Sequence, residues 1–164
     1  MVLYNLLIKL KFLLFDLHGV VIPVDEALQT EKVFLDLKEN LLRAEKLGMK
    51  CGVISATEDN KLLSRIKELG VTEIYSHSID KVSQAEKLLN KYGLDYENIG
   101  FIGDDILDIP LLMKAGFSAA PAKARREVKR IVNYVARNSE SKTVLSDVLD
   151  FISKAREVKS NEPK

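Results

Sequence analysis

Short apolar runs alternate with amphipathic runs along most of the chain, and this alternation constrains the fold more than any other feature. Several apolar runs are continuous, which is typical of strands buried on both faces of a parallel sheet. They are KFLLF (11–15), CGVIS (51–55), EIYS (73–76), IGFIG (99–103), FSAA (117–120) and a candidate sixth, NYVA (133–136).

Most of the segments between these runs carry apolar residues at the spacing of an amphipathic helix. The apolar faces lie at 62, 63, 66 and 69; at 82, 85, 88, 89 and 92; at 128, 131, 132 and 135; and at 144, 145, 148, 149 and 152. Glycines after helical runs predict left-handed caps at Gly48, Gly70, Gly93 and Gly116. The pattern predicts an α/β fold with a doubly wound, mainly parallel sheet in one domain over 1–157, followed by a flexible tail over 158–164.

Composition and charge exclude several classes of protein. Of 164 residues, 46% are hydrophobic and 30% are charged, as in a globular protein. The net charge of +1 gives no bulk attraction to nucleic acid or to an acidic membrane surface. Lys9 and Lys11 interrupt the apolar N-terminus, which we interpret as a lead-in to the first strand rather than a signal peptide. We therefore expect a cytoplasmic protein, and we expect the single cysteine, Cys51, to be buried and unreactive.

Polar residues stand where the predicted strands end. Asp16 follows the first strand, Ser55 ends the second, the GDD sequence (103–105) ends the fourth, and Lys81 opens the helix after the third. The carboxyl ends of parallel strands meet at one edge of a sheet, and ligands bind there. We therefore expect these four elements to converge.

Each of these residues has a simpler interpretation when it is taken alone. Asp16 can be a loop acid, and Asp104 or Asp105 can cap the next helix. Lys81 and His77 can be solvated surface residues, and the SATED sequence after the second strand can begin a helix. The convergence of the set is the stronger argument.

The set as a whole suits phosphoryl transfer. Carboxylates at Asp16 and Asp104 supply the oxygen ligands that Mg²⁺ prefers, and a carboxylate can also attack phosphorus. Ser55 and Lys81 supply a hydroxyl and an ammonium that can hold phosphate oxygens and neutralise charge in the transition state.

The same residues resemble the four motifs of the haloacid dehalogenase (HAD) superfamily. FLLFDLHGVV (12–21), the serine of CGVIS, Lys81 and GDDILDIP (103–110) follow those motifs in order. From about residue 10 to 150 the chain is most similar to the capless sugar-acid phosphatases typified by 3-deoxy-D-manno-octulosonate (KDO) 8-phosphate phosphatases. The resemblance implies the strand order 5-4-1-2-3, no large cap domain, and a homo-oligomer, usually a tetramer.

The resemblance also implies roles for individual residues. Asp16 would be the nucleophile and a Mg²⁺ ligand, and Asp104 and the main-chain carbonyl of His18 would be further ligands. Ser55 and Lys81 would bind the phosphoryl group. In the family, the residue at position 18 is an acid that protonates the leaving group and later activates water. A histidine can exchange protons near neutral pH, so His18 remains a candidate for that catalytic role.

Other positions either extend the resemblance or depart from it. Asp105 and Asp108 would orient the metal site and Lys81. The segment after His18 is short and lacks glycine, which disfavours the hairpin that the family forms there. The family's arginine is missing from SATED, and a glycine-rich stretch near the C-terminus is replaced by NSESKT (138–143).

Three functions compete on these observations. The first is a Mg²⁺-dependent phosphatase acting on a small phosphorylated metabolite, with a sugar-acid phosphate as a candidate. The second is a catalytically impaired HAD-like domain with a structural or regulatory role. The third is a phosphoacceptor receiver domain, but a receiver carries its acid pair first and its lysine last. Here Asp16 comes first, and Asp104 and Asp105 follow Lys81, so the order argues against a receiver.

Overall fold

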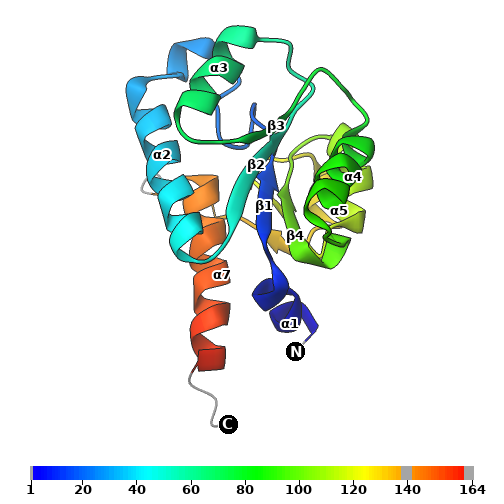
Figure 1. Cartoon of the computed structure of the whole chain (residues 1–164). Coiled ribbons are helices and arrows are strands. Elements are labelled where there is room, and N and C mark those ends of the chain that lie inside the picture. Colours follow the sequence, from blue (N-terminus) through cyan, green and yellow to red (C-terminus); the bar gives the residue numbers. More distant parts are fainter. Residues whose placement is uncertain (1, 138–141, 161–164) are drawn as a thin grey trace.

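Six parallel strands form one sheet in the order β3-β2-β1-β4-β5-β6 (Figure 1). The computed structural model describes residues 2–137 and 142–160. The predicted order 5-4-1-2-3 is confirmed, and the candidate sixth strand lies outside the fifth. The strands are β1 (Phe12–Phe15), β2 (Lys50–Ile54), β3 (Glu73–Tyr75), β4 (Ile99–Ile102), β5 (Phe117–Ala120) and β6 (Tyr134–Val135).

Helices cover both faces of this sheet. In Figure 1, α2 and α7 lie on one side of the strands, and α4 and α5 lie on the other. The α-helices are α1 (Val2–Lys9), α2 (Glu31–Lys46), α3 (Asn60–Glu68), α4 (Lys81–Tyr92), α5 (Ile109–Lys114), α6 (Arg126–Lys129) and α7 (Val144–Ser160). Short 3-10 helices are η1 (Glu26–Leu28), η2 (Tyr96–Asn98) and η3 (Ile106–Asp108). None of the helices in the described ranges is long and apolar enough to cross a membrane.

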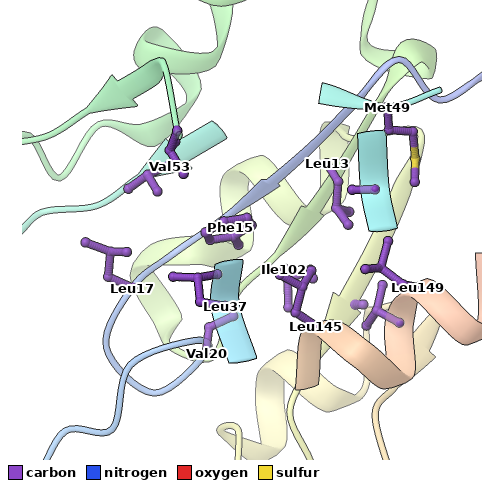
Figure 2. Packing of buried hydrophobic residues seen from close by; sticks show 14 of the residues in the cluster. Leu13, Phe15, Leu17, Val20, Leu37, Met49, Val53, Ile102, Leu145 and Leu149 are labelled. Carbon is purple, nitrogen blue, oxygen red and sulfur yellow. The ribbon is translucent and has the colours of Figure 1, made fainter. Parts of the chain in front are cut away.

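Successive residues of the strands point into two separate cores. Leu13 and Phe15 pack into the core beneath α2 and α7, part of which is shown in Figure 2. Phe12 and Leu14 pack into the core beneath α4 and α5. Each of these side chains is at most 2% exposed, and burying a side chain of this size contributes about 1.5–3 kcal/mol. This double burial explains why the strands read as continuous apolar runs, and it fixes the sheet edge where the polar residues stand.

The N-terminal lead-in to the first strand is helical. Within α1, Leu7 is buried, and its carbonyl oxygen accepts hydrogen bonds from the Arg156 guanidinium of α7 at 3.2 and 3.3 Å. The Leu10 carbonyl oxygen accepts a third at 3.0 Å. These bonds attach α1 to α7, which continues to Ser160, three residues into the range predicted as a tail.

The segment between β1 and α2 contains no hairpin. It has a single bridge between His18 and Ile22, then η1, and α2 begins at Glu31. The absence of a hairpin from this described segment agrees with its lack of glycine, and no cap domain is inserted here.

Two local predictions are wrong, both because of contacts made far along the chain. Gly48, Gly70 and Gly93 have the positive φ expected of caps, but Gly116 does not. A Cβ at Gly116 would lie 2.6 Å from the Glu97 Cα, so this glycine instead allows close packing against η2.

The helix expected over 128–135 ends early. Instead of continuing to Val135, α6 ends at Lys129. The Asn133 N–H donates to the Ser118 carbonyl oxygen, and Asn133 Oδ1 accepts the Ser118 N–H. Pairing with β5 therefore draws these residues out of the helix.

Candidate active site

The predicted site residues gather at the carboxyl edge of the sheet. Asp16 lies one residue after β1, Ser55 one after β2, and Asp104 two after β4, while Lys81 begins α4. A cavity of about 330 Å³ is lined by residues that include Asp16, His18, Ser55, Lys81, Asp104, Asp105 and Asp108. The structure thus brings together every site residue that the sequence singled out.

Lys81 is a buried cation and not a solvated lysine. It is 4% exposed, and its Nζ lies 2.6 Å from Asp16 Oδ2 and 2.5 Å from Asp108 Oδ1. Burial by itself lowers the pKa of Lys81, but the Asp108 and Asp16 carboxylates outweigh burial and raise that pKa above its ordinary value. Lys81 therefore stays charged, although it stands at the positive end of a helix dipole.

Asp108 organises the turn that follows β4. It is fully buried, and its Oδ2 accepts the N–H groups of Asp104 at 2.9 Å and Asp105 at 3.1 Å. Its other oxygen binds Lys81. Asp105 accepts the Ile106 N–H at 2.6 Å, so its interpretation as a helix cap holds. The turn is therefore held in one conformation by Asp108, which also links it to α4.

A glycine allows the acids of β1 and β4 to approach each other. Gly19 has a φ of +80°, and a Cβ there would lie 2.1 Å from Asp104 Oδ2. Its N–H donates to the Ile22 carbonyl oxygen at 2.8 Å, which closes the turn after Asp16. Asp16 Oδ1 accepts the Leu17 N–H at 2.7 Å, so both oxygens of this carboxylate are oriented.

The acidic residues fit a divalent cation. Asp16, Asp104 and Asp108 each offer an oxygen, and these oxygens lie within 4.8 Å of one another. Three carboxylates face the single ammonium of Lys81, which leaves two negative charges in excess if all three are ionised. Asp108 is fully buried and engages its oxygens with two N–H groups and Lys81, whereas Asp16 and Asp104 are partly exposed, so these two are the better placed ligands. An oxygen-only set of this kind suits Mg²⁺.

The surroundings of Asp104 support this fit. Among the described residues, no donor forms a hydrogen bond with its half-buried carboxylate. Burial, followed by the charges of Asp108, Asp16 and Asp105, raises the pKa of Asp104 to about 6. A bound cation would favour the ionised carboxylate and lower that pKa.

Ser55 is placed to donate a hydrogen bond into the cavity. It is 3% exposed, and its Oγ accepts the Thr57 N–H at 3.3 Å. Nothing in the described ranges accepts a hydrogen bond from its hydroxyl group. His18 is half-buried and lines the same cavity. His77 is exposed and does not line it, which agrees with its interpretation as a surface residue.

Some features of the site were not predicted. The Arg125 Nε lies 3.5 Å from Asp105 Oδ1. The main-chain N–H of Arg125 donates a hydrogen bond to the Asp104 carbonyl oxygen at 3.0 Å. No local signal marks Arg125, which is far from the acidic motif in sequence. Gly19 belongs to the first motif, and its positive φ could have been anticipated. Of the NSESKT stretch, residues 138–141 lie outside the described residues.

A family model described as haloacid dehalogenase-like hydrolase matches residues 29–149 of the chain. The 3-deoxy-D-manno-octulosonate 8-phosphate phosphatase KdsC of Escherichia coli strain K12 is 26% identical over 149 residues, which is 84% of this chain and 79% of that protein. The protein of the same name from Yersinia pestis is 29% identical over 105 residues, covering 64% and 56% of the two chains.

Solved structures share the fold. The crystal structure of the Yersinia pestis phosphatase matches with a TM-score of 0.81 and 22% identity, covering 98% of this chain and 89% of that one. A Moraxella catarrhalis phosphatase in complex with a magnesium ion, a phosphate ion and a KDO molecule matches with a TM-score of 0.80 and 19% identity, covering 98% of both chains. These similarities establish the fold.

Proposed function

The chain belongs to the haloacid dehalogenase-like hydrolases, and on that basis we propose that it is a Mg²⁺-dependent phosphatase of a small phosphorylated metabolite. The observation that carries the proposal is the Asp16 carboxylate, held by the buried Lys81 and facing an excess of negative charge at Asp104. The relatives are named for a sugar-acid phosphate, so this class of ester is a candidate substrate and belongs in the substrate screen.

The metal would be held by Asp16, Asp104 and the main-chain carbonyl of His18. When bound, Mg²⁺ neutralises charge on the phosphoryl oxygens and on the attacking carboxylate. Asp108 fixes the turn that carries Asp104 through its bonds to two N–H groups. On the exposed side of the same turn, the Asp105 carboxylate pairs with the Arg125 guanidinium.

The first step is attack by an Asp16 carboxylate oxygen on phosphorus. A bond forms between that oxygen and phosphorus, and the bond from phosphorus to the ester oxygen breaks. Lys81 and the Ser55 hydroxyl donate hydrogen bonds to the phosphoryl oxygens. Protonated His18 gives its proton to the departing alkoxide, which leaves as an alcohol. An aspartyl-phosphate remains on Asp16.

The second step returns the protein to its starting state. Neutral His18 takes a proton from a water molecule, whose oxygen attacks phosphorus. The bond from phosphorus to the Asp16 oxygen breaks, which releases inorganic phosphate and restores the carboxylate. His18 is protonated again and ready for the next substrate. General acid–base help of this kind is worth about 10²–10⁴-fold in rate.

One observation favours a second candidate function. The family's acid is replaced by His18, so a catalytically impaired domain that keeps the metal and phosphate contacts is the alternative. Such a domain would bind Mg²⁺ and phosphate mimics without hydrolysing any ester.

A screen of phosphomonoesters with Mg²⁺ separates these two functions. We expect hydrolysis of at least one ester by the wild type and none by Asp16→Asn, because an amide cannot attack phosphorus. Asp95→Asn is the matched control, because Asp95 is exposed at the opposite edge of the sheet, before η2. If Asp16→Asn keeps activity within tenfold of wild type, the nucleophile lies elsewhere.

We also propose a homo-oligomer, a tetramer by resemblance to the family. Sedimentation equilibrium measures this directly. A mass equal to that of one chain at micromolar concentration would contradict the proposal.

A further inference from the structure

A second and larger cavity opens beside the phosphate site. Its volume is about 540 Å³, within the range of ligand pockets. It lies between the segment 19–28, α2 and the start of α7. Val24 and Asp104 line both cavities, and Gly19 borders the larger one. The two cavities are therefore neighbours that share the wall residues Val24 and Asp104.

The walls of the larger cavity are mainly aliphatic. Eleven of its eighteen lining residues are Val, Ile, Leu, Pro or Gly. Val20 and Leu37 belong to the buried cluster that Figure 2 shows in part. Leu28 lines the cavity from η1 and is 58% exposed, so the walls include apolar surface that still faces solvent.

The buried polar group in these walls is already satisfied. Asn40 is 6% exposed, and its Nδ2 donates to the Asp36 carbonyl oxygen at 2.9 Å and to Thr143 Oγ1 at 3.3 Å. Asn40 Oδ1 accepts a hydrogen bond from Arg43 at 3.3 Å. The Asp36 carboxylate binds Lys32 Nζ at 2.6 Å.

Two of the four remaining charged groups also have partners, and the other two are the rim lysine Lys123 and the proposed metal ligand Asp104. Asp25 Oδ1 accepts the Ala27 N–H at 2.9 Å, and Lys142 pairs with Asp150. Lys123 is exposed at the rim. A leaving group with several hydroxyls would therefore find few partners here, and each buried hydroxyl without a partner weakens binding.

On the basis of the proposed phosphatase function, we infer that this cavity takes the leaving group of the substrate, and that the leaving group is a mainly aliphatic alcohol. The phosphoryl group would stay with Lys81 and Ser55, while the carbon chain displaces water from Leu28 and Val33. Such a leaving group would differ from the polyhydroxylated sugar acid in the names of the relatives.

Binding of non-hydrolysable phosphonates tests the inference without turnover. We expect wild-type protein with Mg²⁺ to bind hexylphosphonate at least about tenfold more tightly than methylphosphonate, measured by calorimetry. Burial of two methylene groups already supplies about tenfold. Equal affinity for the two phosphonates would overturn the inference.

Two variants test whether the preference for hexylphosphonate arises in this cavity. Leu28→Ser combined with Val33→Thr makes the cavity wall polar, and we expect it to remove most of the preference for hexylphosphonate. The affinity for methylphosphonate should stay within about twofold. Leu35→Ser is the matched control, because Leu35 is also an exposed leucine, 63% exposed, but does not line the cavity. Loss of the preference in Leu35→Ser, or its full retention in the double variant, would contradict the assignment.

Two esters of equal chain length extend the test to catalysis. Hexyl phosphate and sorbitol 6-phosphate both carry a six-carbon chain on a primary phosphate, and they differ in hydroxyl groups. We expect kcat/KM to favour hexyl phosphate by at least about tenfold. Preference for sorbitol 6-phosphate or for KDO 8-phosphate would overturn the inference but leave the phosphatase function intact. Tight binding of hexylphosphonate without hydrolysis of any ester would support the cavity assignment and count against the phosphatase function.

Discussion

Replacing Lys81 with methionine tests whether this buried cation holds the site together. Methionine keeps most of the side-chain volume and removes the charge. The Lys81 side chain is 3% exposed and that of Asp108 is 0% exposed, so solvent screens their contact little. Removing one partner of a buried ion pair leaves an uncompensated charge and costs about 3–5 kcal/mol. We expect a loss of this size in the free energy of unfolding at pH 7 without metal.

The pH dependence of this loss has a definite sign. Burial already raises the pKa of Asp108, and removal of the ammonium raises it further. The variant is therefore least stable at high pH, where Asp108 is ionised, and recovers as pH falls through the raised pKa. Adding Asp108→Asn to Lys81→Met should restore stability at pH 7, because a neutral amide replaces the unpaired anion.

Urea denaturation at pH 5 and pH 8 with a chelator present measures these effects. Lys32→Met is the control, because the Lys32 side chain is 80% exposed in its pair with Asp36. An exposed pair contributes at most about 1 kcal/mol. If Lys81→Met costs no more than Lys32→Met, Lys81 is not the structural cation that this account requires.

Three further predictions concern the metal and the proton. Gly19→Ala should weaken Mg²⁺ binding by at least about tenfold, because its Cβ would displace Asp104, whereas Gly70→Ala has nothing within 4 Å and should keep the affinity. Calorimetry on the two variants compares them, and equal affinities would contradict the close approach. Mg²⁺ affinity should fall by up to about tenfold per pH unit below pH 6, because Asp104 has a metal-free pKa of about 6 and its proton competes with the metal. The affinity measured from pH 5 to pH 8 checks this, and a flat profile would refute it. His18→Ala should lower turnover by at least about tenfold and leave Mg²⁺ affinity unchanged, because only the main-chain carbonyl of residue 18 is expected to bind the metal. His18→Asp should raise turnover if histidine is the poorer acid, and no change in either variant would remove residue 18 from proton transfer.

The order of strands and helices could be predicted from the sequence because buried parallel strands have a simple signature. Each of the six strands begins and ends within one residue of its predicted bounds. The polar residues Asp16 and Ser55 could be placed at one edge by topology alone. The periodicity of apolar residues was enough to predict the strands and helices, because each element is set by residues close together in the sequence.

The rest depends on contacts that no local pattern records. Lys81 resembles any other lysine at a helix start, and only the convergence of Asp16 and Asp108 makes it a buried cation. Gly116 follows a helix as a cap would, but its role is set by Glu97. The path of residues after α6 is set by pairing with β5. In each case the deciding partner lies far away in the sequence.

Chemical trapping identifies the residue that carries the phosphoryl group during turnover. Wild-type protein is incubated with Mg²⁺ and acetyl phosphate as the phosphoryl donor, treated with borohydride, digested and analysed by mass spectrometry. Borohydride reduces an aspartyl-phosphate to homoserine, so we expect homoserine at position 16, with Asp104 and Asp108 unchanged. Homoserine at another aspartate, or an unmodified Asp16 in protein that hydrolyses phosphomonoesters, would contradict the account.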